Sequence, residues 1–162
     1  MEIYDAIEHL KEMLKATHIG MFTTVSEDGS LQSRPMIAQD TEFRGYLWFF
    51  TNDSSGKVDQ IDHERQVNIA LVDTKVNRYV SVSGTACLVT DPDKLKELWS
   101  SGLILHYPKG LDEPGLALIK VTVSSIAWWE GASTFVGRIV SVIKAWADKD
   151  PSALGEAGAA SV

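Results

Sequence analysis

The sequence predicts a mainly β domain with flanking helices, in which six short antiparallel strands form a small barrel. Apolar and polar residues alternate with the strand period of two over much of residues 18–129. Turn residues, most clearly Asp28-Gly29, separate these segments at short intervals. Helical periodicity is limited to a few stretches, so a small barrel is favoured over a doubly wound sheet. A chain of 162 residues fits one domain.

The first half of the chain is expected to hold one helix and three strands. The helix is indicated by apolar residues that recur at helical spacing, namely Ile3, Ile7, Leu10 and Leu14. The strands are expected at residues 18–25, 31–38 and 46–51. Pro35 cannot donate a ladder hydrogen bond, so the second of these strands should lie at an edge or carry a bulge.

The second half is expected to begin with a short helix at residues 57–64 and a hairpin formed by strands at 66–73 and 78–89. Another helix at 92–99 and a last strand at 116–129 should follow. In the short helix, Val58 and Ile61 should face inward. Asp91 is a typical N-cap and precedes a proline at the first helical position, which predicts the start of the second helix. The segment 100–114 contains two glycines and two prolines and is expected to be a loop.

Residues beyond the sixth strand are expected to add one helix and a tail. The helix, ending near Trp146, is indicated by apolar residues at Val136, Ile139, Val140 and Ile143. Residues 148–162 are small, rich in Ala and Gly, and without apolar periodicity, so a disordered tail is expected there. The folded domain is therefore predicted to span residues 1–147.

Composition and charge limit the classes of partner. The formal net charge is −7, so a surface for nucleic acid or an anionic membrane is not expected. No apolar run approaches the length of about 18 residues that a membrane span needs. The acidic N-terminus is unlike a signal peptide, which makes the cytoplasm the expected compartment. The single cysteine, Cys87, is expected to be a buried structural thiol.

The candidate chemistry lies in a strand–loop–helix segment, residues 49–57. The hydroxyls of Thr51 and Ser55, the Lys57 ammonium and the N–H groups of a helix N-terminus are the components of a phosphate site. Arg34, on an earlier strand, could pair with the same phosphate through two hydrogen bonds. A serine-rich capping loop with a surface lysine is the alternative. The four histidines are scattered without metal-ligand spacing, so no metal site is expected.

Three segments taken together carry a family resemblance. Ser33-Arg34-Pro35-Met36, the apolar strand Leu47 to Thr51 and the loop Ser55-Gly56-Lys57 resemble the FMN-binding split β-barrel superfamily, which includes pyridoxamine 5′-phosphate oxidase. The similarity extends over about residues 5–130 and is greatest to the general stress protein 26 branch. It implies a six-stranded split barrel that forms a homodimer, with FMN in a groove at the subunit interface.

The resemblance also implies roles for individual residues. Arg34 and Lys57 would hold the flavin phosphate, and Ser55 and Thr51 would contribute hydroxyl contacts. The ring side of the flavin would be lined by Ser33, Pro35, Met36 and Phe50. Trp129, or its neighbour Trp128, would approach the flavin from the end of the last strand, across the dimer. The alternative for both tryptophans is packing in a core or an interface.

The sequence departs from the oxidase itself at two places. The oxidase carries a lysine shortly after the arginine of its second strand, but this chain has Met36-Ile37-Ala38-Gln39. The C-terminal arginine–histidine pair of the oxidase also has no counterpart here. We therefore expect an FMN-binding flavoprotein that acts as an oxidoreductase on a small substrate or, alternatively, binds or sequesters flavin without catalysis. A pyridoxamine 5′-phosphate oxidase, or a relative that binds F420 or haem, is the weaker alternative, and no catalytic residue is assigned.

Overall fold

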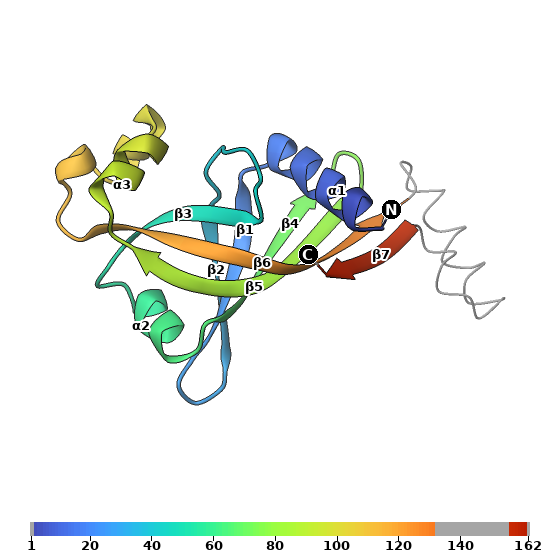
Figure 1. Ribbon diagram of the computed structural model, residues 1–162, viewed down its shortest axis with the longest axis horizontal. Helices are drawn as coiled ribbons and strands as arrows, with labels where there is room; N and C mark the ends of the chain where they lie inside the picture. The colour runs from blue at the N-terminus through green and yellow to red at the C-terminus, as the bar shows by residue number, and fades with distance from the viewer. Residues whose placement is uncertain (1, 132–155, 162) are drawn as a thin grey trace.

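The computed structural model describes residues 2–131 and 156–161 (Figure 1). Within these ranges the α-helices are α1 (Glu2–Ala16), α2 (Gly56–His63) and α3 (Pro92–Leu98). The strands are β1 (Ile19–Val25), β2 (Leu31–Ile37), β3 (Tyr46–Asn52), β4 (Gln66–Asp73), β5 (Arg78–Val89), β6 (Leu116–Glu130) and β7 (Glu156–Ser161). Two short 3-10 helices, η1 (Ser101–Leu105) and η2 (Gly110–Asp112), lie between α3 and β6.

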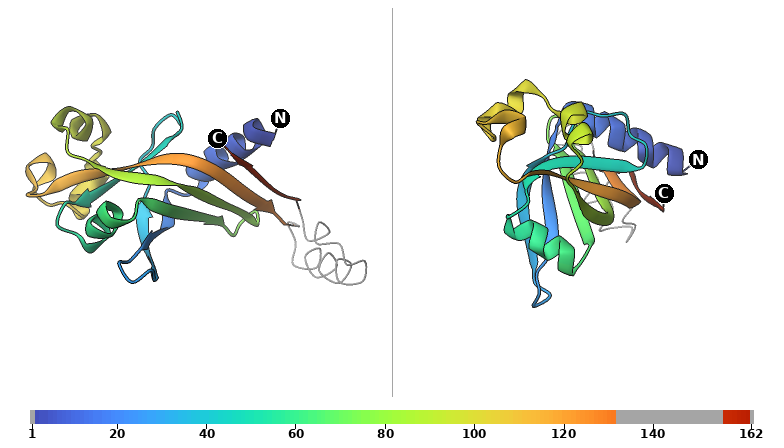
Figure 2. Two further views of the ribbon diagram at one scale, coloured as in Figure 1. Left: turned by 60° about the horizontal axis from the view of Figure 1, so that its bottom comes forward. Right: turned by 60° about the vertical axis from the view of Figure 1, so that its left-hand side comes forward.

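The strands form one antiparallel sheet in the order β2-β1-β4-β5-β6-β3, with β7 paired to β6. The sheet curls so that its two end strands, β2 and β3, come into contact (Figure 2). Among the described residues, an isolated bridge between Ala38 and Phe49 joins these ends. The predicted fold class, a mainly β split barrel of six antiparallel strands, is confirmed. Pro35 lies on the edge strand β2, as its missing N–H requires.

Each of the six predicted strands is present, with bounds within one residue of those predicted. The period-two alternation is a strong signal here because one face of each strand packs on a core and the other does not. Asp91 caps α3, and its side chain accepts a hydrogen bond from the Asp93 N–H, as predicted. The segment between α3 and β6 is mostly loop but contains η1 and η2.

A bulge in the long β5–β6 pair bends the sheet. The register between these strands shifts at Ser83 and Gly84. A Cβ atom at position 84 would lie 2.2 Å from the carbonyl oxygen of Thr122, so only glycine lets the two backbones approach so closely. Bulges increase the local twist of a strand pair, and this one therefore helps the sheet to curl.

The helix α1 covers the barrel core by packing on β4, β5 and β6. Its buried residues are Ala6, Leu10 and Met13. The predicted face also included Ile3, which is 45% exposed, so that part of the prediction was wrong. A stripe that starts at Ala6 fits helical spacing as well as one that starts at Ile3, and packing on the sheet decides between them.

Two apolar clusters lie on opposite faces of β3. The barrel core contains Phe22 and Phe49, whose rings meet edge to face with centroids 5.1 Å apart. The second cluster, beneath α3 and η1, contains Phe50, Leu95 and Leu103. Helix α2 packs on β1 and β5, and its Val58 and Ile61 are buried, as predicted.

Two further predictions concern Cys87 and the C-terminal tail. Cys87 is exposed, so the predicted buried thiol is wrong; its neighbour Ala86 takes the inward position in the strand alternation. Of the expected tail, residues 156–161 form β7 against β6, and the remainder lies outside the described residues. The predicted helix near residues 136–146 also lies outside them. No described helix is long and apolar enough to cross a membrane.

Candidate functional site

The end strands β2 and β3 of the curled sheet meet only at the Ala38–Phe49 bridge among the described residues, and we call the opening between them the split. The split brings together segments that are far apart in the sequence. Arg34 and Met36 point inward from β2, while Phe50 and Thr51 end the apolar run of β3. The loop after β3 leads directly into α2, which carries Lys57 in its first turn. These elements place the basic side chains at one end of the split and apolar side chains further along it.

Hydrogen bonds from two neighbouring elements hold the Arg34 guanidinium in place. One terminal nitrogen, Nη1, donates to the Thr24 hydroxyl over 2.6 Å, and Nη2 donates to the Gln60 Oε1 over 3.2 Å. Thr24 is fully buried on β1 and itself donates to the same Gln60 oxygen. Burial lowers the pKa of Arg34. The guanidinium is therefore partly desolvated and has a fixed orientation.

Lys57 belongs to a second set of polar contacts at the start of α2. Its ammonium donates to the Thr51 hydroxyl over 3.2 Å, and that buried hydroxyl lies 3.2 Å from the Ser55 hydroxyl. Burial lowers the pKa of Lys57, and the neighbouring positive charge of Arg34 lowers it further. The two basic groups are thus close enough for each charge to disfavour the other.

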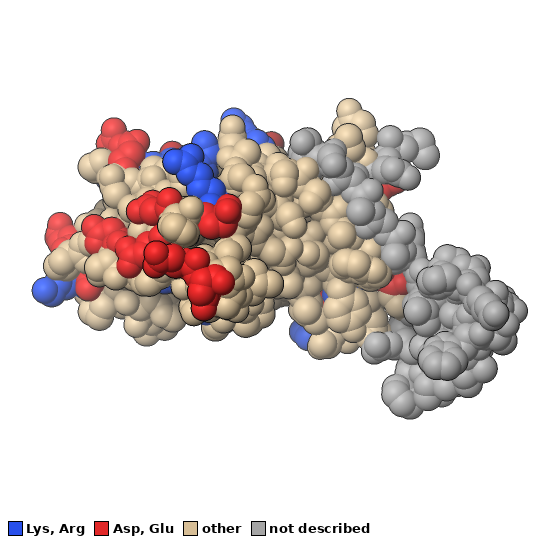
Figure 3. All heavy atoms as spheres, turned by 90° about the horizontal axis from the view of Figure 1, so that it is seen from below, with Lys and Arg blue, Asp and Glu red and all other residues tan. Residues whose placement is uncertain are grey.

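Neither positive charge is balanced within the described part of the chain. The ion pairs found there involve other residues, and none contains Arg34 or Lys57. The molecule as a whole is acidic, with a formal net charge of −7, and acidic side chains gather on the face shown in Figure 3. Two partly buried cations without a counterion, beside two hydroxyls and a helix N-terminus, form a site suited to an anion such as a phosphate.

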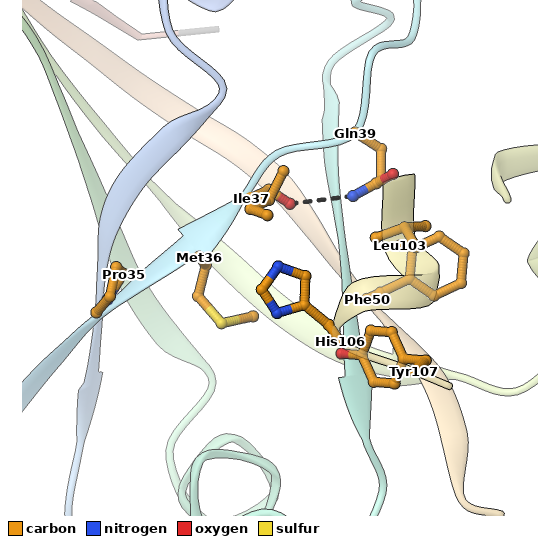
Figure 4. Close-up of a pocket in the computed structure, with 8 residues that line it drawn as sticks. All are labelled: Pro35, Met36, Ile37, Gln39, Phe50, Leu103, His106 and Tyr107. Atoms are coloured by element: carbon orange, nitrogen blue, oxygen red, sulfur yellow. Dashed lines mark hydrogen bonds between the residues drawn. The ribbon is translucent and has the colours of Figure 1, made fainter. Parts of the chain in front are cut away.

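A pocket of about 130 Å³ lies further along the split (Figure 4). Its walls come from β2 and the residues after it, from β3, and from the loop that contains η1: Pro35, Met36, Ile37, Gln39, Phe50, Leu103, His106 and Tyr107. Figure 4 shows His106 in the middle, between Met36 on one side and Phe50 and Tyr107 on the other. No lining residue is a lysine, an arginine or an acid, so this pocket differs chemically from the basic end of the split.

Seven of the nine predicted site residues lie in these two parts of the split. Arg34, Thr51, Ser55 and Lys57 form the basic end, and Pro35, Met36 and Phe50 line the pocket. Strand alternation separates Phe50 from Phe49, which points into the barrel core. The sequence had left open which of these two phenylalanines faces the site.

Ser33 and Trp129 are not brought to the pocket within one chain. Ser33 is exposed on the outer face of β2, and its hydroxyl lies 2.6 Å from that of Thr23. Trp129 is 46% exposed near the end of β6, whereas Thr51 pairs with Ala117 near the start of that strand. Twelve residues of strand separate positions 117 and 129, which is roughly 40 Å. Trp128, in contrast, is buried and stacks on His9, which matches the packing alternative.

Sequence reasoning missed five pocket residues and two residues that hold Arg34. The pocket residues are Ile37, Gln39, Leu103, His106 and Tyr107, and the residues that hold Arg34 are Thr24 and Gln60. The segment 100–114 was interpreted as a connection because of its glycines and prolines. A connection of this length between α3 and β6 is itself a signal, because long ordered loops in compact domains are commonly functional. Among the described residues, no group of His, Cys, Asp and Glu could hold a metal ion.

Comparison with known proteins gives relatives in sequence and in fold. A family profile described as pyridoxamine 5′-phosphate oxidase like matches residues 5–152. The protein bli-3 of Neurospora crassa is 29% identical over 146 residues, which is 84% of this chain and 70% of that protein.

Two solved structures share the fold. A general stress FMN/FAD binding protein from Xanthomonas citri has a TM-score of 0.70 and 26% identity, over 82% of this chain and 93% of that one. A protein from Clostridium acetobutylicum, related to general stress protein 26, has a TM-score of 0.70 and 21% identity, over 80% of this chain and 91% of that one.

Proposed function

The chain belongs to the pyridoxamine 5′-phosphate oxidase-like family, and from this premise we propose that it is an FMN-binding flavoprotein resembling general stress protein 26. The observation that carries the proposal is the uncompensated pair of cations at Arg34 and Lys57. A phosphate monoester has about two negative charges at neutral pH and three acceptor oxygens. These would satisfy both cations together with the hydroxyls of Thr51 and Ser55.

The ring side of the flavin is assigned to the residues that continue along the split. Pro35, Met36 and Phe50 follow directly from the basic end on β2 and β3. They offer apolar contacts, which suit a ring system attached to the phosphate through a short chain. Bound flavin supplies redox chemistry, while the protein contributes binding, orientation and electrostatic tuning.

One chain supplies only part of such a site. Pockets for ligands of this size are about 300–1,000 Å³, whereas the pocket in the split measures about 130 Å³. The outer face of β1 and β2 carries exposed apolar residues that face each other in register, including the pairs Ile19–Ile37 and Met21–Pro35. We assign this face to a homodimer contact that completes the flavin site. Ser33, on the same face, and the exposed Trp129 would then meet flavin bound by the partner subunit.

The dimer contact is tested by placing a charge in that face. Met21→Glu should convert the protein from dimer to monomer in light scattering and should weaken FMN binding in parallel. Tyr4→Glu, on an exposed part of α1, is the control and should do neither. A dimer that survives Met21→Glu would place the contact elsewhere.

Whether the bound flavin turns over is the second part of the proposal. We favour an oxidoreductase acting on a small substrate, because the pocket lined by Pro35, Met36 and Phe50 also carries the polar side chains of His106 and Tyr107. The alternative is a protein that binds or sequesters flavin without catalysis. Reduction of the bound flavin, followed by reoxidation with candidate acceptors in a stopped-flow instrument, separates the two. The expected cytoplasmic location stays a prediction.

The visible spectrum of the purified protein tests the cofactor itself. We expect the two absorption bands of an oxidised flavin, and release of FMN rather than riboflavin on denaturation. A Soret band would indicate haem, and a colourless protein that takes up no FMN would exclude the proposal. Pyridoxamine 5′-phosphate should not be oxidised, because the segment after Arg34 lacks the lysine that the oxidase carries there. That segment is Met36-Ile37-Ala38-Gln39, and Gln39 lines the pocket.

A further inference from the structure

We propose that Gln60 is a positioning residue of the phosphate site. Its amide orients the Arg34 guanidinium and, because the amide is neutral, leaves the positive charge of Arg34 for the phosphate. The inference rests on the proposed function, since it concerns how the same site recognises the flavin phosphate. Its evidence is the complete hydrogen bonding of one amide and the neutrality of the groups that hold Arg34.

The oxygen of the Gln60 amide faces the phosphate site. It accepts hydrogen bonds from the Thr24 hydroxyl and, over 3.2 Å, from the Arg34 Nη2. An amide oxygen has two lone pairs, so its capacity as an acceptor is used. The Thr24 hydroxyl in turn accepts from the Arg34 Nη1 over 2.6 Å. The three side chains therefore form a closed set of hydrogen bonds that holds both terminal nitrogens of the guanidinium.

The nitrogen of the same amide is tied to the hairpin of β1 and β2. Nε2 donates to the Ser26 Oγ over 3.1 Å and to the Gln32 Oε1 over 2.9 Å. These two residues flank the turn of the hairpin, where the Ser26 N–H donates to the Ser30 carbonyl oxygen. An amide nitrogen has two hydrogens to donate, and both are used here. One side chain of α2 thus joins the hairpin to Arg34.

The chemistry of the guanidinium determines which way the amide points. A guanidinium has donors and no acceptor. Rotating the Gln60 amide by half a turn would place its N–H groups against the Arg34 Nη2 and the Thr24 hydroxyl proton, so two hydrogen bonds would be lost. The orientation with Oε1 toward Arg34 is therefore strongly preferred, and it fixes the guanidinium in return.

Every group that holds Arg34 is neutral in the described part of the chain. Besides Thr24 and Gln60, the guanidinium donates to the Phe22 carbonyl oxygen over 3.4 Å. The ion pairs found there do not include Arg34. A carboxylate at the position of the Gln60 amide would also orient a guanidinium, but it would compensate the charge. A neutral acceptor gives the orientation and leaves the charge for an anion.

Titrations of two Gln60 variants of the full chain with FMN and with riboflavin, followed by flavin fluorescence, test the proposal. Gln60→Met keeps the length of the side chain but removes the acceptor, and should weaken FMN binding roughly 5- to 30-fold. Gln60→Glu keeps an acceptor but adds a charge that pairs with Arg34 and repels the phosphate. This variant should weaken FMN binding at least about tenfold. Gln60→Glu with the FMN affinity of the unchanged chain would overturn the proposal.

Three controls separate positioning from support of the fold. Riboflavin has no phosphate, so its affinity should change by less than about twofold in both variants. Gln66→Glu adds the same charge at an exposed position of β4 and should leave the FMN affinity within about twofold. Arg34→Gln removes the group to be positioned, so adding Gln60→Met to it should cost less than about twofold more. Equal losses with and without Arg34, or equal losses for both flavins, would show that Gln60 supports only the fold.

The unchanged protein separates this inference from the proposed function. If it binds FMN more tightly than riboflavin and both Gln60 variants keep that preference, the inference alone fails and FMN binding stands. If the unchanged protein takes up no FMN, the proposed function fails, and the inference, which rests on it, fails with it.

Discussion

The Lys57 ammonium donates a hydrogen bond to the buried Thr51 hydroxyl over 3.2 Å, although the neighbouring charge of Arg34 disfavours its positive charge. A bound anion would offset the repulsion between these two cations. This relationship is the reason for placing an anion at the end of the split, and four predictions depend on it or on the fold that positions it.

Removal of both charges should abolish most of the preference for a phosphorylated flavin. In Arg34→Ala combined with Lys57→Ala, the FMN affinity is expected to fall by about two orders of magnitude, since each charge-assisted hydrogen bond contributes about 1.5–3 kcal/mol. Fluorescence quenching of FMN measures the effect. Arg65→Ala combined with Lys75→Ala removes two exposed charges and should change nothing. Unchanged binding in the first variant would place the phosphate elsewhere.

FMN affinity should depend on pH on both sides of neutrality. It should rise through about pH 6, where the phosphate gains its second charge. The FMN affinity should also fall at alkaline pH, and this fall should begin below the ordinary pKa of a lysine. The reason is that the pKa of Lys57 is lowered, so its ammonium loses its proton at a lower pH. Arg34→Gln removes the repelling charge, raises the pKa of Lys57 and should move the alkaline fall to higher pH.

The control for this profile is Lys57→Gln, in which only the titration of the flavin and the phosphate is left. An alkaline fall of the same size in Lys57→Gln would show that Lys57 is not the titrating group.

The lowered pKa of Lys57 also determines how the free energy of unfolding of the ligand-free protein changes with pH. Stability should increase as the pH rises through the window between the lowered pKa of Lys57 and its unfolded value, because the unfolded chain binds more protons there.

Thr24 should act by positioning Arg34. Thr24→Val keeps the shape of the buried side chain but removes the acceptor of the 2.6 Å bond from Arg34. The expected loss is about 1–2 kcal/mol of FMN binding, roughly 5- to 30-fold. Riboflavin binding, which involves no phosphate, is the internal control and should change little. An equal loss for both ligands would mean that Thr24 supports the barrel and not the phosphate site.

The bulge at Gly84 should be required for the curled sheet. In Gly84→Ala the new methyl group meets the Thr122 carbonyl oxygen, and we expect a loss of about 1–3 kcal/mol in the free energy of unfolding. Thermal denaturation followed by circular dichroism measures it. Gly102→Ala is the matched control, because nothing lies within 4 Å of a Cβ atom there. A melting temperature that is the same in both variants would contradict this role for Gly84.

The sequence was informative where local chemistry determines structure. The strand bounds follow from alternation, the start of α3 from Asp91 and its proline, and the edge position of β2 from Pro35. The choice of Phe50 over Phe49 could not be made from alternation alone, since alternation says only that one of them faces the site. That choice depends on which face of β3 meets the barrel core.

The rest of the site depends on contacts between distant segments. Thr24 and Gln60 lie 36 positions apart and meet at Arg34 only because α2 packs on β1. His106 and Tyr107 reach the pocket through a loop whose course is set by burial of Leu103. The placement of Ile3 and Cys87 failed for a related reason: a helix or strand pattern permits more than one buried register, and packing selects among them.

Titration of the flavin-free protein with FMN and, separately, with riboflavin, followed by flavin fluorescence, tests whether the chain recognises the flavin phosphate. We expect saturation at one FMN per chain and an affinity for FMN at least about 100-fold higher than for riboflavin, because only FMN carries the phosphate that Arg34 and Lys57 would bind. Equal affinities for the two flavins, or no binding of FMN, would contradict it.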